Sequence, residues 1–366
     1  MLDAPENEAD VRAVFAQQGV WCRELGSPLT GLLCELLGRR LDRSTKIGRR
    51  ILDWPGQPDL RLDALPLRLA GGLHALVRRG RLPALARLYP PHPTPPGEVL
   101  WQEVAAALGE VGDELEPWLD RPPQTNEVAR AAALMAGLLV VTARTGLPLA
   151  LYELGASAGL NLLLDRYAYR LGPLPTGSEV SAVRLAPIWQ GPPPPGTAVR
   201  IDGRHGIDLH PVDVTSPADR ERLLAYVWAD QAQRLARTEA AIAIAAADPP
   251  PVDQGDAADW LEARLAPASA PGLARVLMHS IAFQYFPAAT RQRVSEHMAQ
   301  VGAAATRRSP LAWLSYEIDP RRSFQAALRL RLWPGDEEQT LATGDPHAAK
   351  LAWLMADDAS SAGMGA

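Results

Sequence analysis

The sequence predicts an α/β protein with a mostly parallel sheet covered by helices on both faces, a closing C-terminal antiparallel strand pair and a preceding all-helical region. From Asp10 to Arg144, apolar residues recur at helical spacing. From Leu149 onward, short apolar runs alternate with amphipathic stretches of helical period. Such alternation is typical of a parallel sheet whose strands are joined by helices.

Residues 1–125 are expected to form a helical N-terminal cap region. Leu29, Leu32, Leu33 and Leu36 give one such helical face. Further helices are expected over residues 65–79, 98–119 and 127–144, separated by Pro-rich joints. Residues 126–366 are then expected to form the sheet domain, with Asn126 and Glu127 as its first helix cap.

In the sheet domain, a first strand at residues 149–154 is followed by a Gly/Ser turn and a helix at 160–166. The Pro/Gly-rich stretch near 167–204 predicts a hairpin insertion. A long helix is expected over 219–247, and further helices over 257–265 and 288–305. The remaining strands are expected at residues 206–209, 251–256, 273–278, 311–316, 326–333, 338–343 and 350–354.

Charge and composition exclude several classes of partner. The chain has 37 Lys+Arg and 42 Asp+Glu without long charged blocks, which argues against nucleic acid. Two cysteines and scattered histidines give no disulfide framework and no recognisable metal site. The acidic N-terminal segment is unlike a signal peptide, and the longest apolar run, Ala131–Val141, is too short to span a bilayer. We expect a cytoplasmic protein without membrane partners; its oligomeric state cannot be read.

Polar residues follow successive predicted strands. Glu153 ends the first strand and opens the turn Gly155-Ala-Ser157-Ala-Gly159, Asp208 ends the second, and Asp256 follows the third. Ligands of open α/β sheets bind at the carboxyl ends of strands, where glycines let them approach the backbone. A carboxylate at position 153 repels a pyrophosphate and attracts a sulfonium or an amino group.

This order of motifs resembles the class I S-adenosylmethionine-dependent methyltransferases over residues 127–354. The resemblance implies a Rossmann-like sheet in which Asp208 holds the ribose hydroxyls and Asp256 the adenine amine of S-adenosylmethionine. The turn here is Gly-x-Ser-x-Gly where the superfamily has Gly-x-Gly-x-Gly, and about 55 residues separate Glu153 from Asp208. The cofactor-binding residues that the resemblance implies are Glu153, Gly155, Ala156, Ser157, Gly159, Asn161, Asp208, Leu209, Asp256, Ala257 and Arg130.

The segments Gln124-Thr-Asn-Glu127 and Glu153-Leu-Gly-Ala-Ser-Ala-Gly-Leu-Asn161 also resemble a bacterial family of unknown function over the whole chain. That resemblance implies no activity.

A rival interpretation uses the same turn. Gly155-Ala-Ser157-Ala-Gly159 matches the nucleophile elbow of α/β-hydrolases, with Asp319 or Asp345 and then His347 in the required order. The elbow of a hydrolase follows several strands, whereas the residues before Leu149 are predicted to be helical. A catalytically silent nucleotide-binding or S-adenosylmethionine-binding protein is the third alternative.

Two residues are candidates for catalysis on a small-molecule acceptor. His279 follows the fourth strand of the sheet domain and is a candidate general base, or else a structural histidine. Tyr285 lies on the same segment and either lines the acceptor pocket or packs in the core. Arg130 either reaches the ligand carboxylate or begins a solvated helix. The expected reaction is methyl transfer from S-adenosylmethionine, catalysed mainly by positioning.

Overall fold

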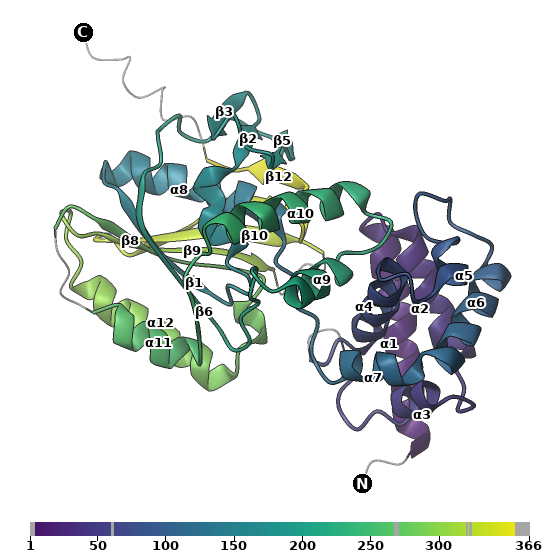
Figure 1. Cartoon of the computed structure of the whole chain (residues 1–366). Coiled ribbons are helices and arrows are strands. Elements are labelled where there is room, and N and C mark those ends of the chain that lie inside the picture. The colour runs from purple at the N-terminus through teal and green to yellow at the C-terminus, as the bar shows by residue number, and fades with distance from the viewer. Residues whose placement is uncertain (1–3, 60–61, 267–270, 320, 322–323, 356–366) are drawn as a thin grey trace. The chain divides into compact units, whose positions relative to one another are not determined.

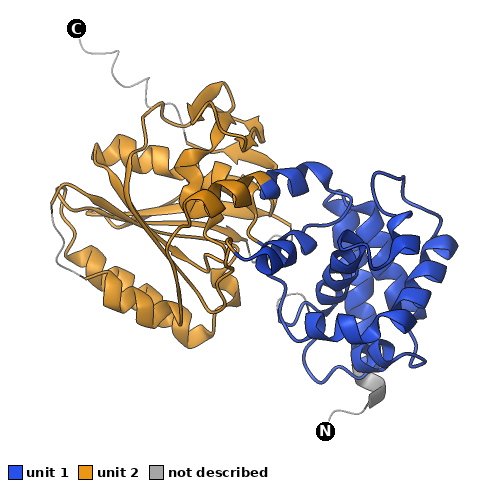
Figure 2. Ribbon diagram, in the orientation of Figure 1, with its two compact units in different colours: residues 1–125, 216–239 blue, residues 126–215, 240–366 orange. Residues whose placement is uncertain are grey.

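The computed structural model describes residues 4–59, 62–266, 271–319, 321 and 324–355. The ends of the two predicted regions, 1–3 and 356–366, lie outside the described residues. The chain divides into two units (Figure 2): a helical unit of residues 1–125 and 216–239, and a sheet unit of residues 126–215 and 240–366.

The helical unit confirms the predicted helical N-terminal region. Its core is formed by leucines, isoleucines and valines on the apolar faces of the helices, including Leu33, Leu69 and Leu115. The helices are α1 (Ala4–Glu24), α2 (Pro28–Arg40), α3 (Lys46–Leu52), α4 (Leu65–Arg78), α5 (Pro83–Ala86), α6 (Gly97–Glu110), α7 (Gly112–Leu119) and α9 (Pro217–Ala225). The single helix expected over 98–119 is two helices that meet at Val111.

The single helix expected over 219–247 is also interrupted, between α9 and α10 (Ala232–Ala247). The intervening Asp230 accepts hydrogen bonds from the Leu29 backbone N–H (2.7 Å) and the Ser27 hydroxyl, so it caps the start of α2. This contact is one reason why residues 216–239, assigned by the sequence to the sheet domain, belong to the helical unit.

The sheet unit is built on nine strands in the order β5-β12-β11-β10-β9-β8-β1-β6-β7. Strands β7, β6, β1, β8 and β9 run parallel, and β10, β11 and β12 form the expected C-terminal antiparallel set. The strands are β1 (Leu149–Leu154), β5 (Ile188–Gln190), β6 (Ile201–Asp208), β7 (Val252–Gln254), β8 (Ala274–Ser280), β9 (Leu311–Ile318), β10 (Ala326–Trp333), β11 (Glu337–Gly344) and β12 (Lys350–Trp353).

Helices lie on opposite faces of this sheet (Figure 1). Helix α8 (Ala131–Thr145) covers one face, where Gly137 packs against Leu314 of β9. Helices α11 (Ala257–Arg264) and α12 (Ala288–Ala303) cover the other, in a core that includes Leu154 and Leu277. Residues Val128–Thr145 are apolar enough to cross a membrane, but 78% of them are buried, as in a core helix.

The predicted insertion forms a small separate sheet of β2 (Ala168–Leu171), β3 (Leu174–Gly177) and β4 (Arg184–Leu185), before β5 joins the edge of the main sheet. The helix expected at 160–166 is a 3-10 helix, η2 (Leu160–Arg166), with a kink at Leu163. Two shorter 3-10 segments are η1 (Val128–Arg130) and η3 (Phe283–Tyr285).

The order of the parallel strands places a topological switch beside β1. The chain leaves β1 for β6 and β7 on one side and then crosses to β8 on the other. Glu153 is in register with Gly206 of β6 and Met278 of β8, so the carboxyl ends of three strands lie together. This is where open α/β sheets bind ligands.

Candidate functional site

The glycine turn after β1 has a backbone conformation that residues with a Cβ rarely adopt. Gly155, Ser157 and Gly159 have φ values of 66°, 53° and 68°, in the left-handed region that glycine tolerates best. A Cβ on Gly155 would lie 2.6 Å from Cβ of Ala282, and one on Gly159 would lie 2.6 Å from Cγ of Pro250. Both glycines are therefore required by conformation and by space.

Asp208 fastens this turn to the end of β6. Its carboxylate accepts the backbone N–H of Ser157 (2.8 Å) and of His210 (2.9 Å). The neighbouring Ala156 donates its N–H to the carbonyl of Ile207 at 3.0 Å. The Leu160 N–H is bound by the Asn126 side chain at 2.9 Å, so Asn126 supports the turn.

Asp256 is the N-cap of α11 rather than a free loop acid. Its Oδ1 accepts the N–H groups of Ala258 (2.8 Å) and Asp259 (3.1 Å). Its Oδ2 accepts the hydroxyl of Thr290, on α12, at 3.2 Å. This hydrogen bond connects the residues that follow β7 with the start of α12.

These groups border one cavity of about 90 Å³, which we name the strand-end cleft. Five predicted cofactor-binding residues line it together. The other five were not among the predicted cofactor-binding residues, although Pro287 before a helical run does signal the start of α12. The lining residues are Gly155, Asp208, Leu209, Asp256 and Ala257 as predicted, and also Ile207, Gly255, Phe286, Pro287 and Thr290.

Glu153, Ser157 and Asn161 do not line the cleft. All three are buried, and each has a polar side-chain atom without a hydrogen-bond partner: Glu153 Oε2, Ser157 Oγ and Asn161 Oδ1. Burial, and then the nearby charge of Asp208, raise the pKa of Glu153 well above its usual value, although a hydrogen bond from Asn161 opposes the shift. Burial of this kind favours the neutral form of a carboxyl. Ala156 and Gly159 shape the turn.

His279 is buried in a hydrogen-bonded cluster. Its Nε2 lies 2.9 Å from the indole Nε1 of Trp313, which can only donate, so Nε2 accepts. Its Nδ1 lies 2.7 Å from Oε1 of Glu317 and therefore donates to that carboxylate. Burial acts to raise the pKa of Glu317, but hydrogen bonds from His279 and from the N–H groups of Ala282 and Phe283 lower it overall.

Both ring nitrogens of His279 are thus occupied, and His279 does not line the strand-end cleft. This arrangement favours the structural alternative over the general base, because neither nitrogen is placed to accept a proton from an acceptor. Glu317 also holds the backbone of Ala282, whose side chain packs against Gly155. Through Glu317, the cluster supports one wall of the glycine turn.

The two remaining candidates lie outside the cleft lining. The Arg130 guanidinium donates to the carbonyls of Ser280 and Pro346, both at 3.0 Å, and so connects the end of β8 with the loop before β12. Tyr285, in η3, is 50% exposed at the surface.

The hydrolase geometry is not assembled at the same turn. The Ser157 hydroxyl is buried and has no hydrogen-bond partner among the described residues, so no histidine activates it there. Asp345 accepts the backbone N–H groups of His347 (2.9 Å) and Lys350 (2.7 Å), and Asp319 that of Arg321 (3.0 Å). These carboxylates stabilise turns. Within the described part of the chain, no cluster of three His, Cys, Asp or Glu side chains could hold a metal.

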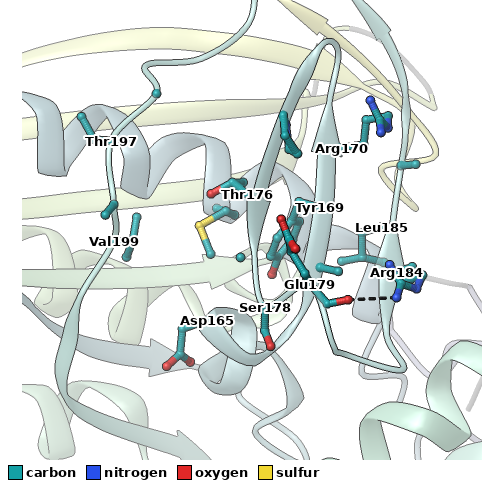
Figure 3. Close-up of a pocket in the computed structure, with 17 residues that line it drawn as sticks. Asp165, Tyr169, Arg170, Thr176, Ser178, Glu179, Arg184, Leu185, Thr197 and Val199 are labelled. Atoms are coloured by element: carbon teal, nitrogen blue, oxygen red, sulfur yellow. Dashed lines mark hydrogen bonds between the residues drawn. The ribbon is translucent and has the colours of Figure 1, made fainter.

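A larger cavity, about 890 Å³, lies at the insertion (Figure 3). It is lined by Met135 of α8, by the small sheet and by the extended residues 196–199. Its acid Asp165 is paired with Arg204 at 2.8 Å, and Arg184 donates to the carbonyl of Glu179 at 2.9 Å. The larger cavity is therefore not the one lined by Asp208 and Asp256, which border the smaller strand-end cleft.

Comparison with known proteins identifies a family and leaves its chemistry open. No curated protein and no solved structure matches the chain. A family model described as "Uncharacterized protein conserved in bacteria (DUF2332)" matches residues 12–353. Because this match spans nearly the whole chain, helical unit included, the protein belongs to that bacterial family.

Proposed function

We propose that the strand-end cleft binds S-adenosylmethionine and that the protein is a methyltransferase acting on a small-molecule acceptor. The observation that carries the proposal is the convergence of Gly155, Asp208 and Asp256 on one cleft beside the topological switch. Parallel strands counted along the chain have the spatial order 3-2-1-4-5, which is that of nucleotide-binding sheets. The resemblance to class I methyltransferases supports the choice of cofactor.

The two carboxylates retain capacity to bind the nucleoside. A carboxylate has roughly four acceptor positions. Asp208 uses two, for Ser157 and His210, and Asp256 uses three, for Ala258, Asp259 and Thr290. In the proposal, Asp208 accepts from the ribose hydroxyls and Asp256 from the adenine amine, while Gly155 admits the ligand to the backbone.

Charge supports this cofactor over a dinucleotide. The cleft presents the two carboxylates of Asp208 and Asp256. Such a site repels a pyrophosphate and favours a ligand carrying a sulfonium and an amino group. The cofactor supplies an electrophilic methyl group, and the chain's part is to orient it and to exclude water.

The cleft volume sets a requirement on binding. About 90 Å³ is below the roughly 300–1,000 Å³ usual for small-molecule pockets. The proposal therefore includes an opening of the cleft on binding. Leu209, which is 58% exposed, is the one large apolar side chain of the lining that is exposed to solvent, and in the proposal it moves to admit the ligand.

Calorimetric titration of the full chain tests the proposal. S-adenosylmethionine and its demethylated product should bind and NAD should not. Asp256→Asn should weaken binding by about tenfold or more, because a hydrogen bond to a charged group is lost. The matched control is Asp202→Asn, at the opposite end of β6 and away from the cleft, which should leave affinity unchanged. Absence of binding by both sulfur compounds, or equal effects of the two substitutions, would contradict the proposal.

Turnover is tested separately, by transfer of labelled methyl to small nucleophiles in the presence of the chain. Binding without transfer to any acceptor favours the catalytically silent alternative.

A further inference from the structure

The helical unit contains its own cavity, of about 380 Å³, which we name the aromatic pocket. This volume is within the range of small-molecule pockets. It lies where the end of α7 and the residues after it meet α9. Its lining residues are Pro117, Trp118, Asp120, Arg121, Arg222 and Tyr226.

Two aromatic rings form the apolar wall of this pocket. Trp118 and Tyr226 meet edge to face, with centroids 5.6 Å apart and planes at 68°. Both rings rest on a glycine pair inside α4. A Cβ on Gly71 would lie 2.6 Å from the Tyr226 ring, and one on Gly72 would lie 3.0 Å from Cγ of Trp118. Glycine weakens a helix interior, so this pair indicates that close seating of the rings is required.

The Tyr226 hydroxyl points to a polar ligand. Tyr226 is only 5% exposed, and its hydroxyl has no hydrogen-bond partner among the described residues. Buried hydroxyls are normally hydrogen-bonded. Burial raises the pKa of Tyr226 to about 12, and the nearby Arg222, Arg68 and Arg121 oppose that rise. The hydroxyl therefore remains a donor in a region of positive charge.

The charges of the pocket do not balance internally. Arg121 is exposed and makes no ion pair or hydrogen bond within the described residues. Arg222 pairs with Asp219 at 3.3 Å and is held in place. Asp120, the only acid in the lining, is already paired with Arg50. The pocket thus offers an uncompensated guanidinium beside a free hydroxyl donor.

We propose that the aromatic pocket binds a small molecule that joins a planar ring to a carboxylate or a phosphate. The ring lies against Trp118, and the anionic group accepts from Arg121, Arg222 and the Tyr226 hydroxyl. Arginine suits such an anion because its planar donors bind two oxygens at once. The inference does not depend on the function proposed for the strand-end cleft.

Calorimetric titration of the full chain with phenyl phosphate, benzoate, benzyl alcohol and inorganic phosphate tests this inference. Phenyl phosphate or benzoate should bind, and whichever is tighter identifies the anionic group. Benzyl alcohol lacks the charge and inorganic phosphate lacks the ring, so each should bind at least about tenfold more weakly. Affinity should fall with added salt, because the recognition is electrostatic.

Substitutions then assign the binding to this pocket. Arg121→Glu, at an exposed position, should weaken the tighter anion at least about tenfold. Tyr226→Phe retains the ring and should weaken it several-fold. Arg79→Glu makes the same charge change at an exposed position of the helical unit outside the pocket, and should have no such effect. The inference is overturned if neither aromatic anion binds at about 10 mM, or if Arg121→Glu and Arg79→Glu act alike.

Discussion

The sheet unit and the helical unit each contain a buried histidine, His279 and His74, and the two histidines have different electrostatic surroundings. In the sheet unit, His279 donates to the carboxylate of Glu317, which holds the backbone packed against Gly155. In the helical unit, Nδ1 of His74 lies 3.1 Å from the carbonyl of Ala225, next to Tyr226 of the aromatic pocket. The side chain of the first histidine is hydrogen-bonded to an anion and that of the second to a neutral carbonyl, so the two units should respond differently to mutation and to acid.

The largest effect is expected from His279→Ala. His279→Ala removes the side-chain donor of the buried Glu317 carboxylate, and a buried charge left without its partner typically lowers the free energy of unfolding by about 3–5 kcal/mol. The half-buried His205→Ala should change it far less. Urea denaturation measures both. Adding Glu317→Gln to His279→Ala should recover part of the loss, since no charge then remains buried. Full stability of His279→Ala would show that the pair is not coupled to the fold.

Cofactor binding by the His279→Ala variant distinguishes structure from catalysis. If His279 acts only through Glu317 on the wall of the turn, His279→Ala should lower stability, and the folded fraction of the variant should bind S-adenosylmethionine more weakly. A large loss of methyl transfer at unchanged stability would instead restore the general-base hypothesis.

The next effect is acid sensitivity of the helical unit through His74. Burial lowers the pKa of His74 from 6.5 to about 4, partly offset by its hydrogen bond to Ala225. Between these values the unfolded chain binds more protons than the folded chain, so stability falls as pH drops from 6.5 towards 4. The full loss amounts to about 3 kcal/mol. His74→Gln should remove this pH dependence, while His92→Gln, at an exposed position, should retain it. Unfolding followed at several pH values checks both, and identical profiles would contradict the assignment.

A smaller effect on stability separates the two reasons why the turn requires glycine, which are its positive φ and its close packing. Gly159→Ala meets both a positive φ and the side chain of Pro250, whereas Gly146→Ala meets a φ of 67° with nothing within 4 Å. The control should cost about 1–2 kcal/mol of stability from conformation alone. Gly159→Ala should cost more and should also weaken S-adenosylmethionine. Equal costs would mean that Pro250 yields easily and that the turn is not tightly packed.

The sequence predicted the strands far better than the contacts at their ends. Hydrophobic periodicity and glycine turns are local signals, so β1 was predicted at its observed bounds and the acids Asp208 and Asp256 at neighbouring strand ends. The break between α9 and α10 was not predicted. It accompanies the capping of α2 by Asp230, a contact with residues about 200 positions earlier in the chain that local sequence patterns do not show.

Candidate side chains were harder to predict than strands, because burial and partners are tertiary properties. Nothing local indicates that Trp313 and Glu317 occupy both nitrogens of His279. Likewise, nothing local indicates that Gly71 and Gly72 make room for the rings of Tyr226 and Trp118 from other parts of the chain.

The smallest effect on stability at low pH is expected from Glu153→Gln. Its effect on the free energy of unfolding should grow as pH rises. Burial and the charge of Asp208 raise the pKa of Glu153, so in the window above its usual value the folded chain binds more protons than the unfolded chain. Stability of the natural chain should then fall as pH rises through this window, by linkage. Glutamine keeps the shape without a charge, so the variant should match the natural chain near pH 4 and exceed it increasingly at higher pH. Bound S-adenosylmethionine is cationic and should stabilise the ionised form of Glu153. Saturating S-adenosylmethionine should therefore raise the free energy of unfolding of the natural chain more than that of the variant. Urea denaturation across pH, with and without the ligand, measures both differences. A pH-independent difference would mean that Glu153 is ionised and paired in the folded chain, and equal stabilisation by the ligand would separate Glu153 from the strand-end cleft.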